Sequence, residues 1–257
     1  MAKFLEGKTS GSALSDIVHL VLNVGFALVA VGLVVLTAVP WPSLLLVVAS
    51  KWRTFIVRPY FLWLSIRANL VDIIANCSLV LLAWLNLENY IALLAITVLF
   101  VLWAAVIKTK NDLVSTKLQA GLSLFLGLSV AVQLCYELPN IVLVAAAGII
   151  GYASARHFLI ALDDDDTPIE LSALCFGFAT AAFAFASSFW QVVFVFGGVA
   201  IPALAISVLL VALFASLYLE YLQEESRTER TEVIFSGIFA AIIQIVILVV
   251  FSGGITY

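Results

Sequence analysis

Long apolar stretches recur along almost the whole 257-residue chain, and they constrain its fold more than any other feature. Each is about 18 to 25 residues long, enough for a helix to cross a hydrocarbon core of roughly 30 Å. Hydrophobic residues make up 64% of the sequence and charged residues 11%, and the mean hydropathy is +1.19. A soluble protein needs a charged exterior that this composition does not supply. The sequence therefore predicts an all-α polytopic membrane helix bundle, forming a single integral membrane domain over residues 1–257.

Breaks in the apolar pattern predict about eight transmembrane helices. The expected spans are residues 17–39, 66–87, 90–107, 114–136, 141–161, 169–190, 201–222 and 233–251. Residues 43–65 mix apolar residues with Lys, Arg, Trp and Tyr, which favours an interfacial segment after the first span, with a re-entrant hairpin as the alternative. Residues 192–196 either extend the sixth span or form a short hairpin.

Lysine and arginine residues gather in the loops after the first, third, fifth and seventh expected spans, whereas Lys3 and Lys8 precede the first span. The positive-inside rule then predicts that those four loops are cytoplasmic and that both termini lie outside. The compact loops favour a prokaryotic inner or plasma membrane as the location of this multi-pass protein.

Several function classes lack support in the sequence. The net charge is −4 and no basic stripe is present, so nucleic acid is not an expected partner. The three cysteines lie inside apolar segments without a CxxC pair, and HExxH, GxSxG and P-loop motifs are absent. We therefore expect no metal and no cofactor, and a non-enzymatic role is favoured over catalysis.

The sharpest polar feature is a carboxylate inside the second expected span. Asn69, Asp72 and Asn76 are spaced i, i+3 and i+7, so they share one helix face. An unpaired charge inside a membrane is costly, and Lys117 or Arg156 is the expected counter-charge. The hypothetical substrate or proton pathway comprises Asn69, Asp72, Asn76, Lys117, Tyr152, Arg156 and His157. The alternative is that Asp72 only locks helices together through an ion pair.

A second, outer polar cluster is expected from the first and fourth spans. His19 and Asn23 lie one turn apart, and so do Gln133 and Glu137. Such groups line a solute or proton path, but a few interhelical hydrogen bonds would give the same pattern.

Three functions from different classes remain open. The first is transport or sensing of a small solute or proton. The second is a non-catalytic assembly or scaffold subunit that packs through small-residue helices, as a homo-oligomer or against another membrane protein, with the lipid bilayer around it. The third is an intramembrane enzyme that acts on lipid.

Overall fold

The computed structural model describes residues 10–52, 62–110, 112–162, 168–189, 192–222 and 229–252. Within these ranges eight helices are long and apolar enough to cross a membrane, so the protein is an all-α polytopic membrane helix bundle. The spanning segments start and end within a few residues of the predicted ones. Hydropathy alone was sufficient to locate the spans, because each helix keeps apolar side chains exposed to lipid.

The elements follow one another in a simple order along the chain. The long helices are α1 (Ser10–Thr37), α4 (Leu62–Leu85), α5 (Tyr90–Leu102), α6 (Leu113–Leu134), α7 (Asn140–Leu162), α8 (Ile169–Ser187), α9 (Ala203–Tyr221) and α10 (Arg230–Ser252). The shorter elements are helix α2 (Trp41–Ser50), the π-helix η2 (Trp103–Ile107) and strands β1 (Val193–Phe196) and β2 (Val199–Pro202).

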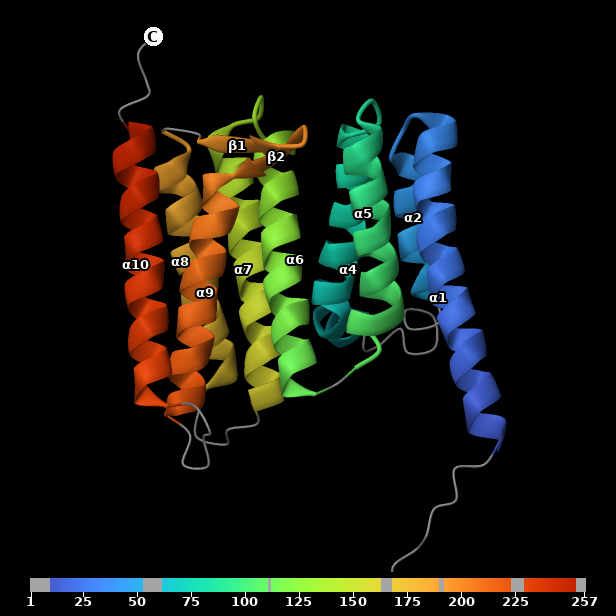
Figure 1. Ribbon diagram of the computed structural model, residues 1–257, viewed down its shortest axis with the longest axis horizontal. Coiled ribbons are helices and arrows are strands. Elements are labelled where there is room, and N and C mark those ends of the chain that lie inside the picture. Colours follow the sequence, from blue (N-terminus) through green and yellow to red (C-terminus); the bar gives the residue numbers. More distant parts are fainter. Residues whose placement is uncertain are drawn as a thin grey trace, which may run out of the picture.

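Helix α2 explains why two consecutive long helices, α1 and α4, begin at the same end of the bundle (Figure 1). It runs alongside α1 but has 10 residues, or about 15 Å of rise, which is half of a membrane crossing. Helices α1 and α4 therefore both start at the same end of the bundle, and α10 finishes at the other end (Figure 1). Residues 43–50 of the expected interfacial segment lie in this half-length helix, and α1 begins at the end of the bundle opposite to the one where α10 finishes. Residues 53–61 of that segment lie outside the described ranges.

The two ends of the bundle differ in composition, since one is rich in lysine and arginine and the other carries the two strands. The basic end is the one where α1, α4, α6, α8 and α10 begin, and the hairpin end is the one that carries β1 and β2 (Figure 1). The lysines and arginines of the described ranges lie in the basic half, namely Lys51, Arg67, Lys108, Lys110, Lys117, Arg156 and Arg230.

Specific contacts hold α2 in its half-length position. Ala38 follows α1 in the left-handed region at φ 56°, and its carbonyl accepts a hydrogen bond of 3.1 Å from the Trp84 indole of α4. The buried Ser43 hydroxyl of α2 donates to the Ala30 carbonyl of α1 at 2.7 Å. Prolines at positions 40 and 42 suit the first turn of a helix, where backbone N–H groups have no partner within the helix. The chain is thereby turned back into the bundle.

The bundle consists of two lobes (Figure 1). One apolar core joins α1, α2, α4, α5 and η2 and reaches Leu126 and Val130 of α6, and two further clusters fill the space among α6, α7, α8 and α9. Helix α4 packs against both α6 and α7, so it connects the lobes. Lys51, at the end of α2, and Asp72, in α4, lie in the first lobe close to this connection.

Residues 193–202 form the hairpin alternative. Gly197 and Gly198 both have positive φ, at 56° and 85°, which matches the type I′ turn favoured in two-residue hairpins. Asn89, the N-cap of α5, donates to the Gly197 carbonyl at 2.6 Å. The hairpin therefore ties α5 of one lobe to α9 of the other.

Candidate functional site

Asp72 lies inside the membrane-spanning part of α4, about 10 Å from the start of that span at Ser65. Its side chain is 15% exposed. Asn76 donates from Nδ2 to Oδ1 of Asp72 at 2.8 Å, one turn along the same helix. Asn69, Asp72 and Asn76 share one helix face, as predicted. They form a connected polar group, because a single lysine, Lys51, contacts both Asn69 and Asp72.

That lysine comes from the end of the half-length helix. Lys51, the C-cap of α2, contacts Oδ2 of Asp72 with its Nζ and donates to Oδ1 of Asn69 at 3.0 Å. The backbone of Lys51 lies at the C-terminal end of α2, where its N–H donates to the Val48 and Ala49 carbonyls. The short length of α2 places this cation inside the bundle rather than at a membrane surface.

A second lysine reaches the same carboxylate from a π-helix. Lys108 follows η2, and its Nζ lies 3.1 Å from Oδ2 of Asp72. The Lys108 amide donates to the Trp103 carbonyl at 2.9 Å, the i to i−5 bond of a widened turn. Such π-helical turns occur frequently at functional sites, since the extra residue redirects the side chains that follow.

The Asp72 centre is defined here as Lys51, Asn69, Asp72, Asn76 and Lys108. It brings two ammonium groups to one carboxylate, so one positive charge is in excess. Excess charge in a low-dielectric region is costly unless a counter-ion or water compensates it. Lys108 is 36% exposed, which gives the centre contact with its surroundings on the basic side.

The expected counter-charges for Asp72 were wrong, because both bind other carboxylates. Lys117 pairs with Glu220 of α9 at 2.6 Å. Arg156 lies 3.0 Å from Oε1 of Glu170, at the start of α8. Both partners lie on helices that come later in the chain, and their sequence positions do not show which helix faces α6 or α7.

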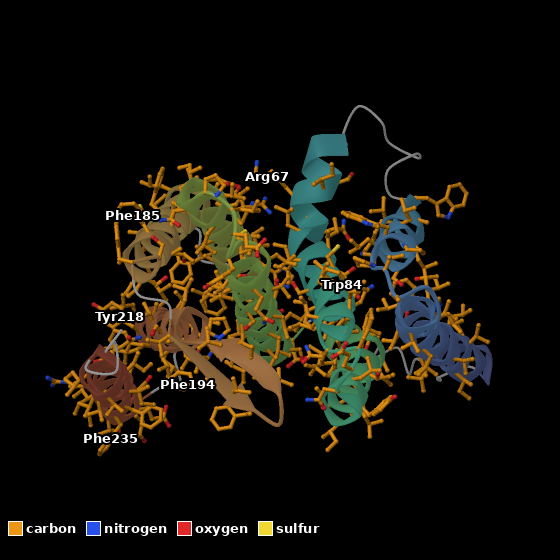
Figure 2. The ribbon with its side chains drawn as sticks, turned by 90° about the horizontal axis from the view of Figure 1, so that it is seen from above. Arg67, Trp84, Phe185, Phe194, Tyr218 and Phe235 are labelled. Atoms are coloured by element: carbon orange, nitrogen blue, oxygen red, sulfur yellow. The ribbon has the colours of Figure 1, made fainter. Side chains whose placement is uncertain are left out.

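Glu170 gathers a second charged group, the arginine cluster of Arg67, Tyr152, Arg156 and Glu170. Arg67 contacts Oε2 of Glu170, and the Tyr152 hydroxyl donates to the same oxygen at 2.9 Å. The Arg67 guanidinium also lies 6.0 Å from the centre of the Tyr152 ring. Figure 2 shows Arg67 on the side of α4 that faces α7. Tyr152 and Arg156 therefore belong to this cluster and not to the Asp72 centre.

His157 connects α7 to the loop that carries Lys108. Its Nε2 lies 2.9 Å from Oε1 of Gln119. Gln119 donates from Nε2 to the carbonyls of Ile107 and Lys110 at 2.7 and 2.9 Å. Because the amide nitrogen of Gln119 is used in donation, its oxygen accepts and Nε2 of His157 donates. His157 thus supports the chain around Lys108 rather than contacting Asp72 directly.

The outer polar cluster is not assembled. His19 is exposed and lies in the first part of α1, towards the basic end, as does Asn23. Gln133 lies at the hairpin end of α6, where it donates to the Ala200 carbonyl of β2 at 3.1 Å, and Glu137 follows it as an exposed residue. The prediction was wrong because it assumed that α1 starts at the same end as Glu137.

Sequence reasoning missed Lys51, Lys108 and Gln119 as parts of the site. One signal was present for Lys51. Only ten residues separate it from Pro40, too few for a full crossing, so an apolar run of that length bordered by proline and lysine indicates a half-length helix. No comparable signal marks η2, because its sequence WAAVI contains neither proline nor glycine.

Three cavities in the described part of the chain are lined by residues outside the Asp72 centre. They lie among α6 to α9, below the hairpin, and along the outside of α7 and α8. Comparison of the chain with protein-family models, with curated proteins and with solved structures finds no match.

Proposed function

We propose that the protein moves protons across the membrane, with Asp72 as the carboxylate that takes up and releases the proton. One observation carries this proposal. A single intramembrane carboxylate contacts two lysines, each delivered by an interrupted helix. Interrupted helices and intramembrane ionisable groups are the features from which transporter sites are built.

The charge pattern supports a simple mechanism. Ionised Asp72 attracts both lysines and thereby holds the end of α2 and the end of η2 against α4. A proton on Asp72 removes that attraction and leaves the two ammonium groups to repel each other. The ends of α2 and η2 then separate, which opens the centre.

Access in the present conformation supports the same mechanism. Lys108 is partly exposed on the basic side. Towards the hairpin end the next residues of α4 are fully buried, among them Leu79, Val80 and Ala83. The centre is therefore reachable from one side and closed towards the other, as alternating access requires of a resting state.

The distribution of cations also supports a membrane orientation. The basic end would face the cytoplasm by the positive-inside rule, and Lys3 and Lys8 fit this assignment because α1 starts at that end. Single cysteines at Glu137 and Arg230, in a background where the native cysteines are serine, test it in intact cells. A membrane-impermeant maleimide should label position 137 and not position 230, and the reverse pattern would refute the assignment.

Proton flux into liposomes tests the role of Asp72. The purified protein is reconstituted around a trapped pH-sensitive dye, and a potassium gradient with valinomycin drives protons. The pH of the lumen should change faster with wild type than in protein-free liposomes. With D72N the rate of this pH change should fall to the protein-free level. The matched control is E220Q, which neutralises the other lysine-paired carboxylate of the described spans and should retain the wild-type rate.

A structural role for Asp72 is the second candidate, and the three cavities favour it because none of them is lined by the Asp72 centre. In that case the protein would be an assembly subunit. Wild-type flux equal to that of protein-free liposomes, with D72N folded but less stable, would reject proton transport in favour of this candidate.

A further inference from the structure

The arginine cluster has more hydrogen-bond donors than its one carboxylate can accept. Two guanidinium groups carry ten N–H donors, whereas a carboxylate offers about four acceptor positions, one of which already binds the Tyr152 hydroxyl. Among the described residues the charge is also unbalanced, because the carboxylate that pairs with both Arg67 and Arg156 is that of Glu170. The cluster is therefore complementary to a further anion with several oxygens.

The position of the cluster points to the membrane interface. Arg67 and Glu170 lie in the first turns of their spans at the basic end, and Arg156 lies in the last two turns of α7. Glu170 is 53% exposed, whereas the two arginines are 20% and 17% exposed. A lipid headgroup can therefore reach the guanidinium groups beside Glu170.

An apolar groove continues from the cluster into the membrane along α7 and α8. Its volume is about 450 Å³. Tyr152 lines its beginning, and the walls continue past Gly148 and Ala145 on one helix and past Gly177 and Ala181 on the other. From Tyr152 to Ala145 the rise is about 10 Å, within the half-thickness of a hydrocarbon core, which is about 15 Å. The groove thus has the length and polarity of a site for one acyl chain.

We propose that the arginine cluster and this groove together bind one anionic phospholipid. Its phosphate lies against Arg67 and Arg156, and one acyl chain lies between α7 and α8. The charge complementarity of the cluster selects an anionic headgroup, and basic sites between helices at the membrane surface bind such lipids. This site does not depend on the proposed role of Asp72, which lies on the other lobe's side of α4.

Native mass spectrometry tests the proposal on the full-length protein. The protein is extracted from liposomes of phosphatidylglycerol and phosphatidylcholine in equal parts, and the bound lipids are counted. Wild type should retain phosphatidylglycerol in preference to phosphatidylcholine. R156Q should weaken this retention about fivefold, the effect of one cation near the membrane surface. R230Q removes an exposed cation at the same end and should leave retention unchanged.

Two further variants separate lipid binding from simple loss of fold. E170Q removes the competing carboxylate and should strengthen phosphatidylglycerol retention. A145F places a ring in the groove from an exposed position and should reduce the number of bound lipids without changing the arginine cluster. Inorganic phosphate, which cannot occupy the groove, should not displace the lipid.

The proposal is overturned by any of three results. They are equal retention of the two lipids by wild type, weaker retention in E170Q than in wild type, and displacement by inorganic phosphate. A dimer without bound lipid, lost in A145F, would instead assign the groove to a second copy of the chain.

Discussion

Replacing Asp72 with leucine should destabilise the folded protein by about 3–5 kcal/mol, the usual cost of removing one partner of a buried ion pair. The substitution leaves Lys51 and Lys108 close together without a carboxylate, and it removes one of the two acceptors of the Asn76 amide. Unfolding in mixed micelles with increasing dodecyl sulfate, followed by tryptophan fluorescence, measures the free energy.

A double substitution distinguishes the pairing from a general effect of leucine at position 72. D72L with K108M should be more stable than D72L alone, because one uncompensated cation is gone. If the two substitutions simply add, Asp72 and Lys108 do not interact and the Asp72 centre is wrongly assigned.

Replacing Gly151 with alanine should lower the free energy of unfolding by about 1–3 kcal/mol, the usual cost of overpacking. A Cβ at position 151 would lie 2.4 Å from Oγ1 and 2.7 Å from Cβ of Thr180. Thr180 is 1% exposed and its hydroxyl is bonded to the Phe176 carbonyl, so it has little room to move. Helices α7 and α8 would have to separate.

Gly25 supplies the matched control, since it also lies within a helix but has nothing within 4 Å of the added Cβ. G25A should leave stability unchanged or raise it by up to about 1 kcal/mol, because alanine is the better helix former. The same unfolding assay compares both variants. Equal effects of G25A and G151A would show that contact with Thr180 does not limit the packing of α7 on α8.

The number and position of the spans were predictable from the sequence because a membrane imposes a minimum apolar length on every crossing helix. The direction of α1 was not, because the positive-inside argument treated each change between apolar and basic segments as a full crossing. Ten apolar residues between Pro40 and Lys51 cross only half of the membrane. The outer polar cluster was predicted wrongly for this reason, because α1 and α6 begin at the same end of the bundle (Figure 1).

The candidate site was predictable in part for a related reason. Helical periodicity fixes which side chains share a face, so the grouping of Asn69, Asp72 and Asn76 followed from spacing. It does not fix which helix lies opposite. Lys51 and Lys108 reach Asp72 because α2 ends early and η2 adds a residue to its turn, and both are irregularities of backbone rather than of hydropathy.

The half-length of α2 also has a consequence for biosynthesis. Lys51 leaves the ribosome before Asp72, whereas Lys108 is added two spanning helices later than α2. When α4 enters the bilayer, its carboxylate can already pair with the cation at the end of α2, so this carboxylate–ammonium pair inserts without net charge. Lys108 then follows with α5 and η2, so the second positive charge reaches Asp72 only after α1, α2 and α4 are in place.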